Sequence, residues 1–400
     1  MLTEAFIDGK KVIMEIEQNS HSAYFVGGCV RDLLLDREIG DIDIATSALP
    51  EQIQAIFPQV IPVGLEHGTV IVRYNHASYE VTTFRLDGKY SDQRHPDSVQ
   101  FIDRINEDLQ RRDFTINALA MDKEGKIIDL FAGKQDLAQK IIRTVGNGYE
   151  RFSEDPLRII RALRFSSQLG FAIEAETLKA IHQVKDQIET LAVERITKEF
   201  TKLFAGSFVH YGIDYLKSTS IYKYLPILSE YPHIIKMLPT NIEPLHTFGE
   251  VLAHFHYLEP TIPVSRWAKA WKCSNQTKKE AIDLIHAIHY YDQHGLEEWL
   301  VYQLDAKLDQ SFIRLMKNLS SNQLIELEDL TRIRRDLVIH TRQDLAINGA
   351  DLVELFPNIS KGRWIHDTLV KIEKEVVFNR LKNNKINIKE WIACNPPVIN

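Results

Sequence analysis

The stretch that decides the fold reads Val26-Gly27-Gly28-Cys29-Val30-Arg31-Asp32 and is followed by Gly40-Asp41-Ile42-Asp43-Ile44-Ala45-Thr46. The short apolar run over 23–26 predicts a buried strand. Gly27 and Gly28 let the backbone turn sharply and approach a bound group, because neither has a Cβ. A helix beginning near Cys29 would direct its amide groups and its positive dipole end at that turn, which suits a triphosphate. Arg31 adds a permanent cation.

Asp41 and Asp43 lie in the second strand that this stretch predicts. Side chains on a strand alternate between its faces, so both carboxylates point one way while Ile42 and Ile44 point to the core. Two carboxylates this close repel each other unless a cation lies between them. Mg²⁺, a hard ion with oxygen ligands, satisfies that need. Nucleotidyl transfer uses metal ions beside a bound triphosphate, so Asp41 and Asp43 are predicted to be catalytic metal ligands.

Two alternatives accompany this interpretation. An Asp-x-Asp pair by itself is common among exposed strand residues near turns, but the glycine turn and Arg31 at short range favour the metal site. Glu80, on a later predicted strand, is a candidate third carboxylate. An exposed strand glutamate is the alternative there, and the sequence leaves the choice open.

Composition sets the broad class. The 400-residue chain is long enough for several domains. It has no apolar run of ~18 residues and no signal-like N-terminus, so no membrane contact is expected. Three widely spaced cysteines favour a reducing cytoplasm. The net charge of −7 counts against a uniformly basic surface but not against a local basic groove. The charge is uneven, because nine arginines cluster in the first 165 residues: Arg94, Arg104, Arg111, Arg112, Arg143, Arg151, Arg158, Arg161 and Arg164.

The first 147 residues mix helix and strand patterns. We expect an amphipathic helix within 1–22, a helix over 47–57 and a hairpin of strands 69–74 and 79–85 with a loop of about four residues. The polar segment 87–98 predicts a long loop, either a functional lid or a plain surface linker. Further on we expect a strand near 99–101, a helix-like stretch over 108–120 and short strands at 126–130 and 141–143.

From residue 147 the pattern is almost entirely helical. Ser153 and Pro156 predict a helix start, and Asp155, Arg158 and Arg161 then lie near one another on one face. That spacing most often indicates an ordinary surface ion pair. Alternatively, a carboxylate beside a guanidinium offers acceptor and donor edges that match cytosine and adenine and reject uracil and guanine.

Residues 206–400 contain no catalytic grouping in sequence. We interpret the frequent histidines as satisfied or surface residues and the five tryptophans as packing residues. The last 40 residues have a basic bias that suits an RNA backbone, through Lys361, Arg363, Lys371, Lys374, Arg380, Lys382, Lys385 and Lys389.

Taken together, the motifs resemble class II, bacterial-type CCA-adding enzymes, which are tRNA nucleotidyltransferases of the polymerase β-like superfamily. The resemblance covers roughly the first 200 residues strongly and rests on the opening stretch and on Arg111-Arg112-Asp113-Phe114-Thr115-Ile116-Asn117-Ala118, Glu154-Asp155-Pro156-Leu157-Arg158, Glu194-Arg195 and Glu199-Phe200. It implies an α+β fold: a nucleotidyltransferase head with a small mixed or antiparallel sheet, then an all-helical neck, body and tail. The corresponding ranges are 1–147, 148–205, 206–310 and 311–400.

The resemblance also implies a function and site roles. The chain would add C, C and A to the tRNA 3′ end from CTP and ATP, without a template and with Mg²⁺; a bacterial poly(A) polymerase or a partial CC- or A-adding enzyme is the alternative. Asp41 and Asp43 would bind the catalytic metals, and the segment 87–97 would be a flexible loop that reshapes the site. Nucleotide contacts would come from Gly28, Arg31, Arg112, Asp155, Arg158, Arg161 and Arg164. No obligate protein partner is implied.

Overall fold

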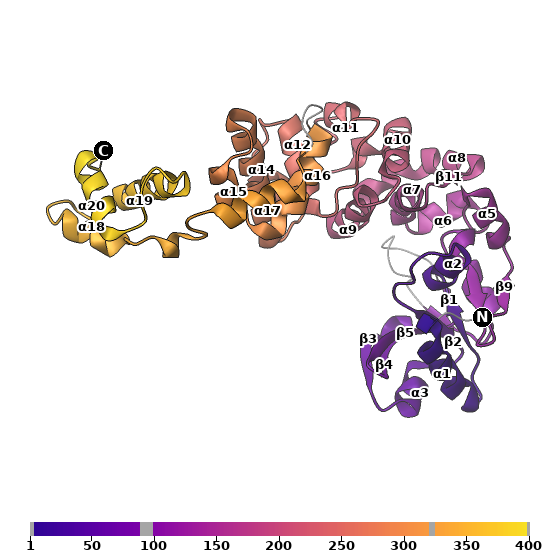
Figure 1. Ribbon diagram of the computed structural model, residues 1–400. Helices are drawn as coiled ribbons and strands as arrows, with labels where there is room; N and C mark the ends of the chain where they lie inside the picture. The colour runs from indigo at the N-terminus through magenta and orange to yellow at the C-terminus, as the bar shows by residue number, and fades with distance from the viewer. Residues whose placement is uncertain (1–3, 89–98, 320–324, 398–400) are drawn as a thin grey trace. The chain divides into compact units, whose positions relative to one another are not determined.

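A computed structural model describes residues 4–88, 99–319 and 325–397. The chain divides into two compact units (Figure 1): unit 1 comprises Met1–Pro244 with Ala270–Lys272, and unit 2 comprises Leu245–Lys269 with Cys273–Asn400. The finer four-part division predicted above stays a prediction. None of the helices in the described ranges is long and apolar enough to cross a membrane.

Unit 1 begins with a seven-stranded mixed sheet of order β3-β4-β5-β2-β1-β8-β9. Its strands are β1 (Ala23–Val26), β2 (Asp43–Thr46), β3 (Val60–Gly64), β4 (Thr69–Tyr74), β5 (Ala77–Thr83), β8 (Leu119–Met121) and β9 (Ile127–Asp129). β2 pairs antiparallel with β1 and parallel with β5, which places Asp43 opposite Glu80. The α+β fold class predicted from the sequence is therefore confirmed.

Short helices and small strands surround this sheet. They are α1 (Glu4–Gln18), α2 (Gly28–Leu34), α3 (Pro50–Ile56), η1 (Leu65–His67), β6 (Arg85–Asp87), β7 (Val99–Phe101), α4 (Ile105–Gln110), η2 (Thr115–Asn117), α5 (Gly133–Gln139) and β10 (Ile141–Ile142). Both α1 and α2 pack on β1 (Figure 1). The Phe6 ring of α1 meets the Phe25 ring of β1 edge to face, with centroids 4.8 Å apart.

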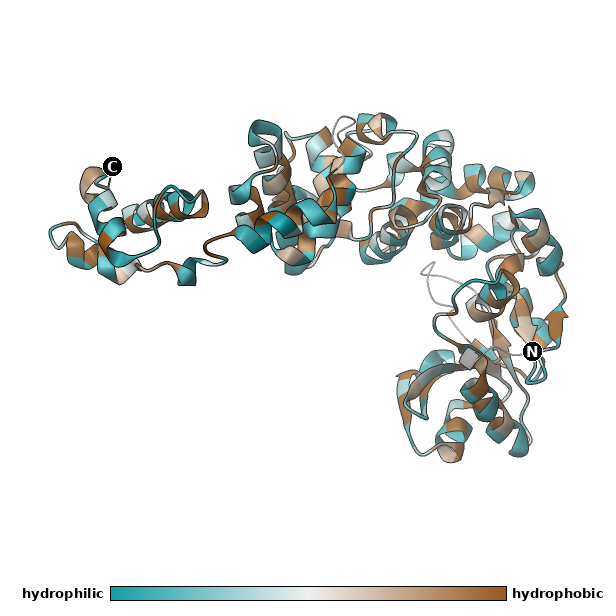
Figure 2. Ribbon diagram, viewed as in Figure 1, coloured by the Kyte–Doolittle hydropathy of each residue, from teal (hydrophilic) through white to brown (hydrophobic). Residues whose placement is uncertain are grey.

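Helices make up most of the rest of unit 1. They are α6 (Gly148–Glu154), α7 (Leu157–Leu169), α8 (Ala175–Val184), η3 (Lys185–Thr190), α9 (Val193–Phe204), α10 (Val209–Thr219), η4 (Ile221–Tyr224) and α11 (His233–Met237), with β11 (Ala172–Ile173) between α7 and α8. α7 packs against α9 and α10. α9 buries Ile196, Phe200 and Leu203, and such apolar stripes are visible along the helices in Figure 2.

Unit 2 is helical in its described residues. Its elements are α12 (Phe248–Leu258), α13 (Val264–Ala270, whose last residue belongs to unit 1), α14 (Asn275–His294), α15 (Glu298–Gln303), η5 (Ala306–Leu308), α16 (Asp309–Leu319), α17 (Leu327–Asp336), η6 (Arg342–Asp344), α18 (Gly349–Leu355), α19 (Arg363–Val377) and α20 (Lys385–Cys394). Buried Glu250 of α12 accepts hydrogen bonds from Ser311 and Arg314 of α16, which ties the two helices together.

The predicted packing role of the tryptophans is confirmed. Trp267 and Trp271 are fully buried, and Trp299, Trp364 and Trp391 belong to one apolar cluster of unit 2 or pack against it. The interpretation of the histidines is wrong at His254. That side chain is buried, neither ring nitrogen has a hydrogen-bond partner, and burial lowers its pKa to about 4.

Several local predictions need correction. The strand that was expected to carry both aspartates begins only at Asp43. The β4–β5 turn consists of Asn75 and His76, both with positive φ (49° and 66°), instead of four residues. The helix expected over 108–120 breaks into α4, η2 and β8, and β3 was not predicted. Ser153 lies inside α6, which Asn147 caps, so it does not start a helix.

The predicted loop over 87–98 falls largely on residues 89–98, which lie outside the described residues. Its assignment as a lid therefore stays a prediction.

Candidate active site

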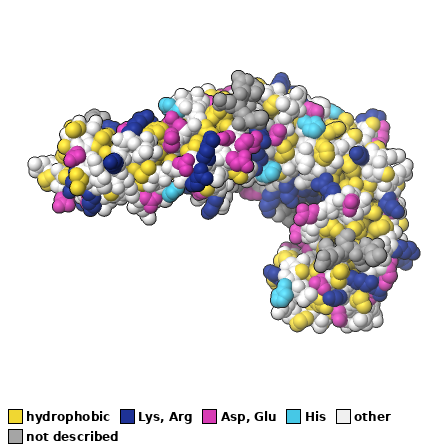
Figure 3. Space-filling model, in the orientation of Figure 1, with side chains coloured by type: hydrophobic (Ala, Val, Ile, Leu, Met, Phe, Trp, Pro, Cys, Tyr) yellow, Lys and Arg dark blue, Asp and Glu magenta, His cyan; other side chains and the backbone are white. Residues whose placement is uncertain are grey.

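A cavity of about 890 Å³ opens in unit 1 beside the first turn of α2. Its lining comes from the inner strands β1, β2, β4 and β5 of the sheet, from the segment 111–117 and from α7 and α9. All nine residues that the sequence singled out contribute to this lining: Gly28, Arg31, Asp41, Asp43, Arg112, Asp155, Arg158, Arg161 and Arg164. Lys and Arg side chains gather on the face of unit 1 near α9 (Figure 3).

The glycine turn brings the backbone close to the arginines. Gly27 has φ +71°, and a Cβ there would lie 2.9 Å from Nη1 of Arg112. α2 begins at Gly28, one residue before the predicted start near Cys29. A side chain at Gly27 would therefore be strained by its backbone and would displace a cation of the cavity wall.

The carboxylates lie on the sheet side of the cavity. Ile42 and Ile44 are 7% and 1% exposed, whereas Asp41 and Asp43 both line the cavity, so the predicted alternation is confirmed. Glu80 lines it too, next to Asp43 in register. Burial first, and then the charge of Glu80, raises the pKa of Asp43 to about 6; Asp41 adds to the rise and Arg112 opposes it.

This donor set fits a divalent cation. No described residue forms an ion pair with Asp41, Asp43 or Glu80, so their negative charges have no direct protein counter-ion there. Within the described ranges, no three His, Cys, Asp or Glu side chains are grouped closely enough to hold a metal ion. Mg²⁺ commonly binds through one or two carboxylates, with water and substrate phosphate completing the shell, and Asp41 with Asp43 meets that description.

The raised pKa of Asp43 predicts a pH dependence. A carboxylate must be deprotonated to bind a metal, so protonation of Asp43 below about pH 6 competes with the metal. We expect the apparent affinity for the activating metal to fall by about tenfold for each pH unit below that value. Titrating the metal at a series of pH values in an activity assay measures this, and an affinity that stays constant from pH 7 to 5 would contradict it.

Carboxylates and the side chain of Asn117 fix the orientation of three arginines, Arg31 on α2 and Arg111 and Arg112 just after α4. Arg31 pairs with Asp32 (2.9 Å) and donates from Nη1 to Oδ1 of Asn117 (2.7 Å). Arg111 and Arg112 both pair with buried Asp108, at 2.7 and 3.2 Å. Burial would raise the pKa of Asp108, but the two guanidinium groups outweigh it and lower that pKa.

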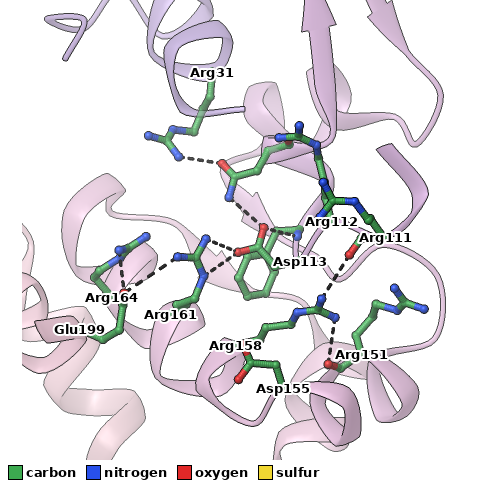
Figure 4. Close-up of polar contacts among 12 residues, drawn as sticks. Arg31, Arg111, Arg112, Asp113, Arg151, Asp155, Arg158, Arg161, Arg164 and Glu199 are labelled. Carbon is green, nitrogen blue, oxygen red and sulfur yellow. Dashed lines mark hydrogen bonds and ion pairs between the residues drawn. The ribbon is translucent and has the colours of Figure 1, made fainter. Parts of the chain in front are cut away.

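The α7 arginines are held from two directions (Figure 4). Arg161 donates from Nε and Nη2 to Oδ2 of Asp113, at 2.8 and 2.6 Å. Arg164 pairs with Glu199 of α9 at 2.8 Å. Burial would raise the pKa of Asp113, but the charge of Arg161 and the hydrogen bond from Asn117 outweigh it and hold that pKa well below the usual range. These contacts therefore fix Arg161 and Arg164 in place before any nucleotide binds.

The side chains of Asp155 and Arg158 do not bond to each other, contrary to the direct pair expected from their spacing; only the backbone amide of Arg158 donates to the backbone oxygen of Asp155, at 3.0 Å. Asp155 pairs with Arg195 of α9 at 2.8 Å, while Arg158 binds Glu154 (2.9 Å) and the backbone oxygens of Arg151 and Arg111 (3.1 and 3.2 Å; Figure 4). The reason is that α6 ends at Glu154 and α7 begins at Leu157, so no continuous helix connects them. Both still face the same cavity.

Asp113, Glu154 and Glu199 were named from the sequence only as members of motifs, and the role of these residues and of Asp108 in holding the arginines was not predicted. Asp108 and Glu154 carried a usable signal, because each lies three or four residues before the arginine it pairs with. Spacing gave no such signal for Asp113 and Glu199, since they lie 48 and 35 residues from Arg161 and Arg164. Only the packing of α7 against α9 and the segment 111–117 brings them together.

Comparison with family models matches three parts of the chain. Residues 23–143 match a model described as the poly A polymerase head domain. Residues 170–231 match a probable RNA and SrmB-binding site of polymerase A. Residues 252–392 match a putative tRNA nucleotidyltransferase domain 2.

Relatives match along the whole chain. The CCA-adding enzyme of Oceanobacillus iheyensis is 51% identical over 398 residues, covering 99% of each chain. That of Bacillus cereus is 41% identical over 400 residues, covering 98% of this chain and 99% of the relative. The crystal structure of the Bacillus stearothermophilus CCA-adding enzyme in complex with CTP matches with a TM-score of 0.88 and 36% identity, covering 98% of both chains.

Proposed function

This chain belongs to the family of CCA-adding enzymes, and we propose that it completes the 3′ end of tRNA by adding C, C and A from CTP and ATP without a nucleic-acid template. The observation that carries the proposal is one cavity that joins two unpaired carboxylates to a set of fixed arginines. Similarity over 99% of the chain to enzymes of this name favours it over a poly(A) polymerase or a partial enzyme.

We assign the metal of this site as Mg²⁺, held by Asp41 and Asp43; the nucleotidyltransferase superfamily generally uses a divalent metal. When bound there, one metal ion would activate the attacking hydroxyl, and a second would stabilise charge on the phosphates. In the reaction, the tRNA 3′ oxygen forms a bond to the α-phosphorus, the bond to the β-phosphate oxygen breaks, pyrophosphate leaves and the hydroxyl proton passes to solvent.

The chain's own residues bind and orient the nucleotide. Gly28 lets the backbone approach it, and Arg31 and Arg112 face its phosphates, because guanidinium donors match phosphate oxygens. Arg161 and Arg164 hold the nucleotide from α7. Asp155 and Arg158 select the base, with Asp155 accepting from the amino group of cytosine or adenine and Arg158 donating to a ring acceptor.

Arg195 positions Asp155 in this scheme. Its Nη2 is 2.8 Å from Oδ2 of Asp155, and this contact leaves the orientation of the carboxylate fixed. Arg195→Ala is expected to lower the preference for CTP over UTP by about tenfold, less than removal of Asp155 itself. Single-nucleotide incorporation assays with CTP and UTP measure this. An unchanged preference would show that Arg195 is not needed to position Asp155.

The remaining assignments follow from the same proposal. The basic C-terminal residues of unit 2 would contact the tRNA backbone, since phosphate contacts depend on local positive charge. The division into head, neck, body and tail at residues 147, 205 and 310 is retained as a proposal, as is a location in the cytoplasm.

Product sequencing tests the proposed activity. The enzyme is incubated with tRNA lacking its last three nucleotides and with all four nucleoside triphosphates, and the 3′ ends are read. We expect C-C-A and no further extension. A long A tail would indicate a poly(A) polymerase, C-C alone or A alone would indicate a partial enzyme, and unchanged tRNA would contradict nucleotidyl transfer.

A further inference from the structure

The ring of Phe165 lies at the centre of three arginines of the cavity. The guanidinium carbon of Arg164 is 4.2 Å from the ring centroid, that of Arg31 is 5.2 Å away and that of Arg161 is 5.4 Å away. Such distances are within the range of cation–π attraction, in which a cation is drawn to the negative face of an aromatic ring. Phe165 is 4% exposed and belongs to the cavity wall.

The three cations come from two helices and share this one ring. Arg31 lies on α2, whereas Arg161 and Arg164 lie on α7. Carboxylates also pair with each of them: Asp32 with Arg31, Asp113 with Arg161 and Glu199 with Arg164, and Glu199 also reaches Arg161 at 3.9 Å. Among the described ion pairs, no single carboxylate contacts all three guanidinium groups, whereas the Phe165 ring does.

The cluster has an electrostatic cost that the ring helps to offset. Burial and then the charge of Arg161 lower the pKa of Arg164 to about 10, and Arg31 adds to the lowering. Nε of Arg164 is buried and has no hydrogen-bond partner. A rigid aromatic face can stabilise such a crowded guanidinium without occupying the donors that an anionic ligand would need.

We propose that Phe165 is a positioning residue whose ring face holds Arg31, Arg161 and Arg164 in the arrangement that receives the nucleotide. The inference rests on the proposed function, since it takes CTP and ATP as the ligands of this cavity. Phe165 does not itself select the base, because Asp155 and Arg158 are held by other partners and neither contacts its ring in the described structure.

The sharpest test changes the ring's charge distribution and keeps its shape. Replacing Phe165 with pentafluorophenylalanine inverts the quadrupole of the ring, so its face no longer attracts cations. We expect the affinities for CTP and ATP, measured by calorimetry on the full-length protein, to fall together by about tenfold. The preference for CTP over UTP is expected to stay unchanged.

Phe152 supplies the matched control. It is fully buried in α6 of the same unit, and no cation contact of its ring is known among the described residues. Three further variants separate loss of packing from loss of the cation contacts. They are pentafluorophenylalanine at position 152, Phe152→Leu and Phe165→Leu. We expect Phe165→Leu to weaken nucleotide binding as the fluorinated ring does, and Phe152→Leu to lower only the melting temperature.

A spectroscopic measurement tests the proposal without any nucleotide. In protein labelled with ¹⁵N-arginine, ring currents should displace the Nε–H resonances of arginines beside Phe165, and three of them should move in the Phe165→Leu variant but not in Phe152→Leu. Unmoved resonances, or wild-type nucleotide affinity with the fluorinated ring at 165, would overturn the proposal. If the wild-type protein binds neither CTP nor ATP, the proposed function fails and the resonances alone decide the role of Phe165.

Discussion

Replacing Asp43 with Asn is expected to lower the rate of CMP transfer to tRNA by about 10³-fold, because an amide cannot hold the metal that stabilises charge in the transition state. Asp41→Asn should have an effect of similar size, since both carboxylates line the same cavity. Both variants should still bind tRNA, which the proposal places on other surfaces. Single-turnover incorporation of labelled CMP and a separate tRNA-binding assay measure the two quantities.

Asp186→Asn is the matched control for these variants. Asp186 is exposed on η3 and does not line the cavity, so the substitution makes the same change in charge within unit 1. Its rate should equal that of the wild type. Incorporation at the wild-type rate by both Asp41→Asn and Asp43→Asn would reject the metal assignment, because that assignment requires both carboxylates as metal ligands.

Replacing Asp155 with Ala is expected to reduce the preference for CTP over UTP by about 10- to 100-fold, the range that one well-formed bidentate base contact supplies. The carboxylate accepts from the amino group of cytosine, and uracil carries an oxygen at that place. Removing the carboxylate therefore removes both an attraction to the correct base and a repulsion of the wrong one. The ratio of kcat/KM values for CTP and UTP measures the effect.

Asp155→Asn sharpens this prediction. The amide keeps the size of the side chain but presents a donor as well as an acceptor, so it can bond to the oxygen of uracil. We expect UTP incorporation to rise more in Asp155→Asn than in Asp155→Ala, while metal activation stays as in the wild type. If both variants add C, C and A with the wild-type nucleotide preference, base selection does not depend on Asp155.

The main features of the fold were predictable because they depend on short-range patterns. The apolar run 23–26 became β1, and the alternation around Asp41 and Asp43 placed their side chains toward the cavity and Ile42 and Ile44 in the core. The helical character after residue 147 followed from periodicity, and the structure confirms it. The sequence also identified nine residues that line one cavity, although their individual roles stay predictions.

What could not be predicted depends on contacts between distant segments. β8 is only three residues long and is stabilised by pairing with β1 and β9, so the local pattern around 108–120 was mistaken for a helix. The partner of Asp155 is Arg195, 40 residues away, and no spacing rule would select it over Arg158. The meeting of Phe165 with Arg31 likewise depends on the packing of unit 1.

The most direct test of the central claim is a crystal structure of the enzyme with CTP and Mn²⁺, a metal whose anomalous scattering marks its position. The account predicts an anomalous peak about 2.1 Å from a carboxylate oxygen of both Asp41 and Asp43, next to the phosphates of CTP. A peak elsewhere in the cavity, or CTP bound with these two carboxylates turned away from its phosphates, would contradict it.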